Sequence, residues 1–502
     1  AQVRLNGVDI GEVRWNGLAT QQATLTFDAA LLADGENAVE VAALADTAAP
    51  YGIFYLDSFV LRYRSRYQAR GDRLAFSAGG NPVVRVSGFG TPNVLLFDVT
   101  RAKRPVRILA TPFADGAGSW GVAIAPQSPD ARYEALTREA AAAPAWVAAD
   151  APSALRDPRN RGRYVVVTTR DLLGPARRLA ELRGGIVADI EDVYDEFNHG
   201  SPSPFALRRF LTYATRRWRV RPRYVVLAGD GTFDYRDNLG VGGNLIPPMM
   251  IGTGQGLFPS DTWFADSAGG PAPELAIGRL PVASAAELDR LIDKIILRES
   301  TPDRAWTASL LALADDADRA GDFPADSDRI AALAPPALTV NRIHLGALTL
   351  AAARAGLFAA VRDGAGLVNY VGHAGYDVLA TEGLLTSADV DLLENAARPT
   401  VLTAMTCLAG DFAFPGSPGL AELLVRRETG GAAAVWAPTG LSVNDPAVRL
   451  AEGFYAAAFA GTDAVRIGDV VLAAQRAYEQ ARNPAALLRI YVLLGDPAMR
   501  LR

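Results

Sequence analysis

The chain has 502 residues, of which half are hydrophobic and 21% are charged, with a formal net charge of −5 at pH 7. This composition supports sizeable cores and excludes a disordered chain, and it offers no broad basic surface for nucleic acid. The single cysteine excludes an intrachain disulfide framework, and three histidines argue against a histidine-rich metal centre. No apolar run is long enough to cross a bilayer as a helix. We therefore expect a globular chain of about three domains.

Residues 1–145 predict a β-sandwich or jelly-roll-like domain. Asn-Gly pairs at 6–7 and 16–17 each follow a short apolar stretch and are typical of tight hairpins. Gly, Pro and Asp separate further short strands, and this spacing favours a sandwich. The domain loosely resembles carbohydrate-binding jelly rolls, and we expect a propeptide-like or binding role. Strands are expected at 3–5, 13–15, 38–42, 54–63, 83–86, 94–97 and 106–110.

The rest of the chain predicts an α/β fold. Residues 146–162, rich in Ala, Pro and Arg, predict a linker that follows a short helical Ala run. Unbroken β-branched strands then alternate with helical patterns, which predicts parallel sheet covered on both faces. We expect two consecutive α/β subdomains, at 163–300 and 305–502. Strands are expected at 163–168, 185–190, 223–228, 275–278, 309–314, 338–343, 366–371, 400–406 and 431–436, and helices at 172–183, 204–218, 284–299, 348–362, 387–396, 420–427, 446–460 and 468–480, with a last apolar segment at 487–494.

A histidine and the only cysteine each follow one of these strands directly. His373 comes after the strand at 366–371, and Cys407 comes after the strand at 400–406. One predicted helix separates the two strands, so they are expected to be neighbours whose carboxyl ends lie side by side. A nearby imidazole can act as base toward a thiol or stabilise the thiolate. The alternative is a buried, inert cysteine and an unrelated loop histidine; the adjacent strand ends and the flanking glycines favour catalysis.

The segments around these two residues, Asn369–Gly375 and Thr403–Cys407, resemble gingipain-type cysteine peptidases, family C25 of the caspase–haemoglobinase-like clan. The resemblance covers roughly residues 163–502 and implies a caspase/gingipain-like fold. It implies that Cys407 forms a thioester, that His373 is general base and acid, and that the backbone N–H groups of Cys407 and Ala374 form the oxyanion hole. The family usually has Gly where this chain has Ala374. Further matching segments are 191–197, 227–231, 259–264, 277–281 and 494–497.

The resemblance also suggests weaker assignments. Asp261 falls where arginine-specific members look to have the acid that binds a basic P1 side chain, and Trp263 could pack on the stem of that side chain; a turn cap and core packing are the alternatives. The family binds calcium, and the acidic loop with Asp230, Asp234 and Asp237 is a candidate structural site, although a solvated turn fits its spacing better. No cofactor is required for the expected chemistry.

The resemblance therefore implies a secreted or surface-attached bacterial cysteine endopeptidase that acts on proteins or peptides, and the position of Asp261 suggests a preference for basic P1 residues. A sortase-like transpeptidase with the same dyad, or an inactive peptidase-fold binding protein, are the alternatives. The N-terminal β domain is expected to keep the enzyme latent or to dock substrates. A third acid that orients His373 is expected but cannot be assigned from the sequence, and His199 and His344 have no evident nucleophile partner.

Overall fold

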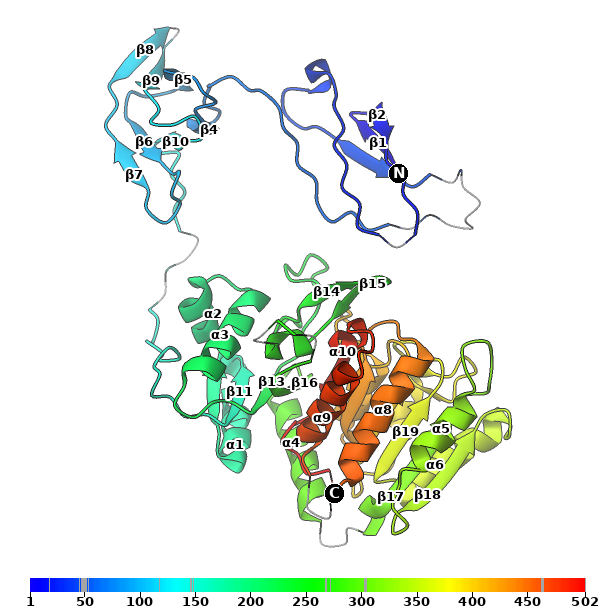
Figure 1. Ribbon diagram of the computed structural model, residues 1–502. Coiled ribbons are helices and arrows are strands. Elements are labelled where there is room, and N and C mark those ends of the chain that lie inside the picture. The colour runs from blue at the N-terminus through cyan, green and yellow to red at the C-terminus, as the bar shows by residue number, and fades with distance from the viewer. Residues whose placement is uncertain are drawn as a thin grey trace. The chain divides into compact units, whose positions relative to one another are not determined.

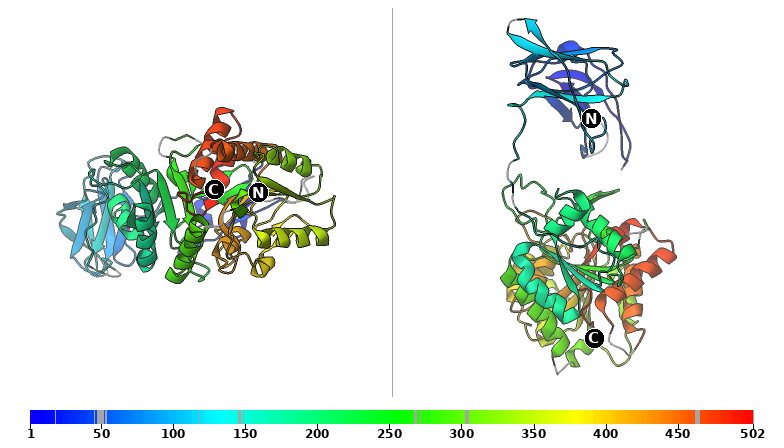
Figure 2. Two further views of the ribbon diagram at one scale, coloured as in Figure 1. Left: turned by 90° about the horizontal axis from the view of Figure 1, so that it is seen from below. Right: turned by 90° about the vertical axis from the view of Figure 1, so that its left-hand side faces the viewer.

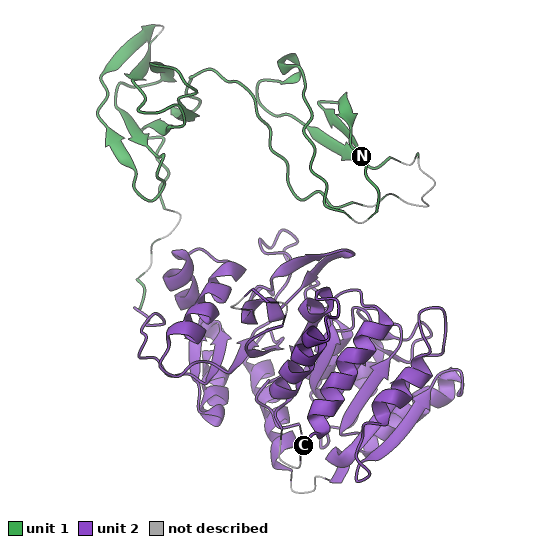
Figure 3. Cartoon of the chain, in the orientation of Figure 1, with its two compact units in different colours: residues 1–151 green, residues 152–502 purple. Residues whose placement is uncertain are grey.

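The computed structural model describes the chain except for residues 18, 45, 47–51, 53, 117, 145, 146, 148, 267, 268, 271, 302–304, 462–464 and 502. The chain divides into two compact units, Ala1–Ala151 and Pro152–Arg502 (Figure 3). The division falls inside the segment that the sequence predicts as a linker. Each unit has its own buried core.

The N-terminal unit begins with a small three-stranded sheet in the order β2-β1-β3. Strands β1 (Gln2–Leu5) and β2 (Val8–Glu12) form the hairpin predicted at Asn6-Gly7, where both turn residues have positive φ. Strand β3 (Val39–Ala42) pairs with the other edge of β1. The prediction of a second hairpin is wrong, because residues 13–15 form no strand that could lead into a turn at Asn16-Gly17.

Two further sheets in this unit pack against each other. They have the orders β4-β10-β6-β7 and β5-β9-β8, and their buried side chains share one core that includes Phe89, Val122, Leu96 and Tyr133. The sandwich thus occupies residues 73–137 rather than the whole predicted domain. Residues 54–63 form no strand, and none of the described segments pairs with them in a sheet. The bounds are β4 (Arg73–Ser77), β5 (Val84–Phe89), β6 (Val94–Asp98), β7 (Val106–Ile108), β8 (Pro112–Gly116), β9 (Ser119–Ile124) and β10 (Arg132–Thr137).

The C-terminal unit is built on one ten-stranded sheet in the order β12-β11-β13-β16-β24-β23-β22-β19-β17-β18 (Figure 1). The two predicted subdomains are therefore two halves of one sheet, joined where Arg279 of β16 pairs with Leu494 of β24. Neighbouring strands run parallel except β23 and β24. The bounds are β11 (Tyr164–Thr168), β12 (Ile186–Asp189), β13 (Tyr224–Ala228), β16 (Ala276–Leu280), β17 (Ser309–Ala314), β18 (Thr339–His344), β19 (Leu367–Val371), β22 (Thr400–Met405), β23 (Ala432–Pro438) and β24 (Tyr491–Leu494).

Helices cover both faces of this sheet (Figure 2). Alternate residues of β11 belong to different cores: Val166 packs on one face and Val165 and Val167 on the other, as a strand buried on both sides requires. The helices are α1 (Leu173–Arg183), α2 (Ile190–Asn198), α3 (Pro204–Arg217), α4 (Ala285–Ser300), α5 (Phe323–Ala331), α6 (Leu350–Asp363), α7 (Leu420–Arg426), α8 (Asn444–Phe459), α9 (Ile467–Gln480) and α10 (Ala486–Ile490).

Several local predictions are corrected. The sequence patterns do not predict helices α2 and α5, and the segment between β13 and β16 contains a hairpin of β14 (Met250–Thr253) and β15 (Gly256–Pro259). The helix expected at 387–396 is a short 3-10 helix, Ser387–Leu392, after a hairpin of β20 (Val378–Leu379) and β21 (Leu385–Thr386). Asp389 turns back to the backbone of Thr386 and pairs with Arg354, which holds this segment in a capped turn. Among the described residues, no helix is both long enough and apolar enough to span a membrane.

Candidate active site

The two residues of the predicted dyad follow the carboxyl ends of neighbouring strands. In the parallel pair β19–β22, Val371 lies beside Met405, and His373 and Cys407 each follow two residues beyond that last pair. A buried polar contact fixes this register: Asn369 Nδ2 donates to Thr403 Oγ1 (2.9 Å), and the two residues are direct partners in the ladder. A shift of one position would leave both groups buried without their bond, which is costly.

The backbone of His373 is held from both sides. Its N–H donates to Asp315 Oδ2 (3.1 Å), and the Tyr370 hydroxyl donates to its carbonyl (2.6 Å). Gly372, with φ of 156°, lets the chain turn between them; a Cβ there would lie 2.4 Å from the Asp315 Cβ and 2.6 Å from the Tyr370 hydroxyl oxygen. Burial raises the pKa of the Asp315 carboxyl, while the two N–H groups it accepts from oppose that rise.

The His373 ring contacts an acid that the sequence analysis did not assign. Asp318 Oδ2 lies 3.0 Å from Nε2, and the edge of the ring meets Phe323 at a centroid distance of 5.2 Å. Backbone N–H donation from Ala320 and the contact with His373 lower the Asp318 pKa, so this carboxylate is ionised at neutral pH. Asp318 follows β17, which is the strand next to β19; a search of the acids after that strand could have found it.

Cys407 is partly buried beside the backbone of Ser442. Its sulfur lies 3.4 Å from the Ser442 carbonyl oxygen and accepts from the Ser442 N–H at 3.3 Å. Burial raises the pKa of the thiol, and the Ser442 N–H partly offsets this. Among the described residues no hydrogen bond joins the sulfur to the imidazole; such contacts often tighten only when substrate binds. The chain turns sharply after Cys407, where Leu408 has φ of 52°.

Two backbone N–H groups near the dyad are free of hydrogen bonds to other described residues. They belong to Cys407 and Ala374, the pair that the resemblance assigns to the oxyanion hole. The short hairpin after His373 pairs Gly375 with Val378 and Ala380 with His373, and this pattern leaves the Ala374 N–H unused. Ala374 is not among the described residues with positive φ. The replacement of the usual glycine by alanine therefore needs no left-handed backbone.

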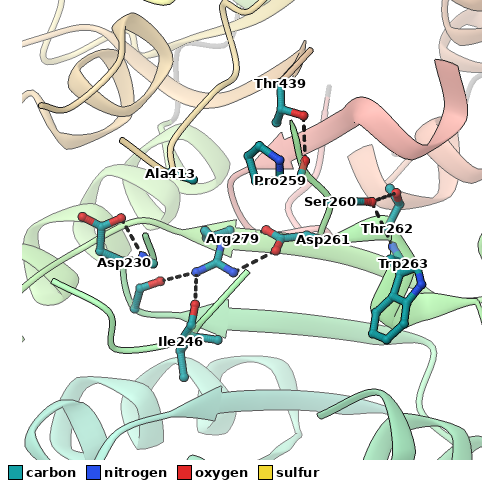
Figure 4. Close-up of polar contacts among 12 residues, drawn as sticks. Asp230, Ile246, Pro259, Ser260, Asp261, Thr262, Trp263, Arg279, Ala413 and Thr439 are labelled. Atoms are coloured by element: carbon teal, nitrogen blue, oxygen red, sulfur yellow. Dashed lines mark hydrogen bonds and ion pairs between the residues drawn. The ribbon is translucent and has the colours of Figure 1, made fainter. Parts of the chain in front are cut away.

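Asp261 does not lie in an open specificity pocket. Its two carboxylate oxygens accept from Arg279 Nε (2.7 Å) and Nη2 (2.8 Å) (Figure 4). The Asp261 side chain is only 3% exposed and the Arg279 side chain 0%. Arg279 Nη1 also donates to the carbonyls of Gly229 and Ile246, and its guanidinium lies 4.4 Å from the centre of the Phe412 ring. Both oxygens already accept from Arg279, and the buried pair leaves neither of them open to a basic P1 side chain.

Trp263 packs within the protein surface rather than around an open site. Its ring meets Phe205 edge-on at 5.3 Å, and the Arg208 guanidinium lies 4.2 Å from the ring centre. The backbone N–H of Trp263 donates to Ser260 Oγ (Figure 4). These contacts join the loop after β15 to α3, and they explain the tryptophan without a substrate.

The candidate calcium loop does not gather its carboxylates. Asp230 accepts from the Gly231 N–H, Asp234 from the Leu239 N–H and Asp237 from the Gly242 N–H, so each caps its own turn. These residues do not fit a shared calcium ion. In the described part of the chain, one group of three carboxylates has oxygens within 4.8 Å of one another, and it lies elsewhere, at Asp315, Asp316 and Glu382.

The other two histidines have structural surroundings. His199 ends α2 in a left-handed conformation, with φ of 57°. His344 ends β18, and burial lowers its pKa. Neither residue contacts the only cysteine of the chain.

Comparisons with known proteins agree with this fold. The model of peptidase family C25 matches residues 157–502, and no curated protein matches the sequence significantly. The complex of Porphyromonas gingivalis RgpB pro- and mature domains is 19% identical with a TM-score of 0.58, covering 68% of this chain and 80% of that chain. The Arg-specific cysteine proteinase gingipain R (RgpB) is 20% identical with a TM-score of 0.57, covering 69% and 79%. The chain therefore belongs to peptidase family C25, the gingipain-type cysteine peptidases.

Proposed function

We propose that this chain is a cysteine endopeptidase in which Cys407 is the nucleophile and His373 is the general base and acid. The observation that carries the proposal is the register of β19 and β22, which sets both residues at neighbouring strand ends inside the segment that matches family C25. The free N–H groups of Cys407 and Ala374 support it, since they can stabilise a developing oxyanion.

The reaction follows from these groups. The Cys407 thiol passes its proton to His373 while the sulfur bonds to the substrate carbonyl carbon, whose oxygen gains negative charge. When that oxyanion collapses, the C–N bond breaks, and His373 gives its proton to the leaving amine. A thioester remains on the sulfur. Water then attacks the thioester as His373 takes a proton, and the return of that proton to the sulfur restores the thiol with release of the acid product.

Asp318 has a positioning role in this scheme. Because its carboxylate accepts from Nε2 of His373, the ring keeps its hydrogen on that nitrogen, and Nδ1 is the atom that exchanges a proton with the sulfur. An ionised partner also stabilises the imidazolium that forms after the first transfer.

The test is cleavage of a diverse peptide library, read by mass spectrometry, with Cys407→Ala and His373→Ala as controls. We expect internal cleavage by the wild-type protein, loss with Cys407→Ala, and a rate at least about 10²-fold lower with His373→Ala. An added amine, such as glycine amide, distinguishes hydrolysis from acyl transfer. Ligated products in place of acids would replace the endopeptidase with a transpeptidase, and equal cleavage by wild type and Cys407→Ala would reject the nucleophile.

We also propose that residues 1–151 keep the enzyme latent. One structural relative is a complex of pro- and mature domains, and this chain too carries a separate β-rich unit before its peptidase unit. Proteolytic removal of residues 1–151 is expected to raise kcat/KM; unchanged or lower activity would contradict latency. Secretion or surface attachment stays a prediction from the family, and fractionation of producing cells tests it.

A further inference from the structure

An exposed aromatic cluster borders the candidate active site. The Phe414 ring meets Phe233 at a centroid distance of 5.8 Å and Tyr376 at 5.1 Å. The two phenylalanine residues are each 41% exposed, although rings of this size are usually buried. Val241 is also exposed, and it lies against Gly416 on the loop that carries Phe414. We call Phe233, Val241, Tyr376 and Phe414 the aromatic cluster.

The cluster is continuous with both catalytic loops. Phe414 lies on the loop that leaves Cys407, and Tyr376 lies on the loop that leaves His373. Backbone bonds fix this arrangement: the Phe233 N–H donates to the Ala413 carbonyl (3.0 Å), and the Leu420 N–H donates to the Tyr376 carbonyl (2.7 Å). Loops from the carboxyl ends of β13, β19 and β22 thus present one apolar surface beside the dyad.

We propose that the aromatic cluster is a substrate subsite for a bulky apolar side chain, aromatic or branched aliphatic, near the scissile bond. The inference rests on the proposed function, because a peptide whose carbonyl reaches Cys407 must run past the adjoining loops. The four side chains of the cluster carry no charge. Binding of an apolar group to them is therefore favourable, whereas a charged group would lose its hydration there without gaining a partner. An exposed apolar patch continuous with a polar reaction centre is typical of a binding site.

The arrangement also gives an expected magnitude. An apolar side chain laid on these rings buries surface on both partners, and one or two methylene groups in such a site change kcat/KM by about 10-fold or more. Removing the Phe414 ring takes away the central contact of the cluster. The loss should therefore be about 10-fold for peptides with an apolar residue at the preferred position, and small for peptides with Ser there.

The experiment is a positional-scanning peptide library cleaved by wild type, Phe414→Ala, Phe233→Ala and Leu182→Ala. Leu182 is a matched control: it is exposed, and it lies at the end of α1, which returns from the carboxyl end of β11 to the opposite edge of the sheet. We expect wild type and Leu182→Ala to favour Phe, Tyr or Leu at one position near the cut. Both phenylalanine variants should lose that preference while they still cleave the Ser peptides.

Each outcome decides the proposal separately from the proposed function. Cleavage without an apolar preference, or with a preference that both phenylalanine variants retain, overturns the subsite and leaves the peptidase standing. If Phe414→Ala fails to fold, Phe233→Ala carries the test. If the wild-type protein cleaves nothing, binding of the same peptides to Cys407→Ala replaces cleavage, and equal binding of Phe and Ser peptides overturns the subsite. If the variants instead make the full chain more active and keep the wild-type preference, the cluster serves latency through residues 1–151 and not substrate binding.

Discussion

Two regions of the same sheet edge use their polar groups in opposite ways. At the ends of β13 and β16, Arg279 and Asp261 pair with each other, and the guanidinium also uses the carbonyls of Gly229 and Ile246. At the ends of β19 and β22, the thiol of Cys407 and the ring of His373 are only partly buried. The first region is a closed network, and the second leaves groups available to a substrate.

The contrast shows that a position at the carboxyl ends of the strands does not by itself place a residue in a substrate-binding site. Both regions lie where parallel sheets carry their sites, and both contain charged or reactive residues within recognisable motifs. What distinguishes them is the partner of each group. A buried carboxylate with a bidentate guanidinium is already neutralised, whereas an exposed imidazole with one acid still has a nitrogen free for proton transfer.

The largest expected effect comes from breaking the closed region. Arg279→Met leaves the Asp261 carboxylate buried without its partner, which should lower the free energy of unfolding by about 3–5 kcal/mol in urea denaturation. The double variant Arg279→Met/Asp261→Leu is the control, because it removes both charges and should recover much of the loss. If Arg279→Met were as stable as wild type and had instead a changed P1 preference, Asp261 would return as a specificity residue.

Asp318→Asn tests the acid that contacts His373, in the region whose groups stay available to a substrate. The amide can donate to Nε2 and favour the wrong tautomer, so we expect kcat to fall about 10²-fold or more and the pH profile of kcat to change, with little change in KM. Because the pair is exposed, the midpoint of thermal unfolding should barely move. Asp316→Asn, two residues earlier on the same loop, is the matched control. Loss of stability with unchanged kcat would make Asp318 a structural residue only.

Thr403→Val tests the register that joins the two catalytic strands. The substitution keeps the shape but removes the hydroxyl that bonds Asn369 (2.9 Å) and Tyr455 (2.8 Å) inside the sheet. We expect a loss of about 1–3 kcal/mol in unfolding free energy because buried polar groups lose their partner. Activity per folded molecule should fall as well. A stable, fully active variant would show that the hydrophobic pattern alone fixes the register.

The smallest effect concerns the resting state of the thiol. Burial raises the Cys407 pKa, and only the thiolate reacts with iodoacetamide. The alkylation rate of the folded protein should therefore be low at pH 7 and rise with pH, with a midpoint above that of free cysteine. Unfolded protein is the reference. A rate that is already maximal below pH 7 would indicate a preformed thiolate–imidazolium pair.

Sequence reasoning succeeds where one physical rule dominates. Buried parallel strands such as 400–405 are unbroken apolar runs, so the α/β fold and the neighbouring ends at His373 and Cys407 are predictable. The sequence does not predict that the two halves form one continuous sheet, because they meet through a single register position, Arg279 with Leu494. The strand expected at 54–63 shows that β-branched and aromatic residues do not suffice without a pairing partner.

The roles of two acidic residues, Asp261 and Asp318, do not follow from the sequence for a different reason. The position of Asp261 in a family-like motif suggests a substrate-binding acid, but its partner Arg279 lies 18 residues further on, in β16, and no local sequence pattern indicates that pairing. Asp318 cannot be assigned from the sequence because the pattern does not show that β17 is the neighbour of β19. In both cases strand order, which sequence patterns leave open, decides what a charged side chain does.

The most direct test of the central claim is intact-mass measurement after treatment with a peptidyl chloromethyl ketone that places an electrophilic carbon where a scissile carbonyl would bind. The account predicts a single covalent adduct on Cys407 of folded wild-type protein, formed much faster than on unfolded protein, absent in Cys407→Ala and strongly slowed in His373→Ala. Labelling at the same rate in folded wild type, unfolded protein and His373→Ala would contradict a catalytic dyad at the ends of β19 and β22.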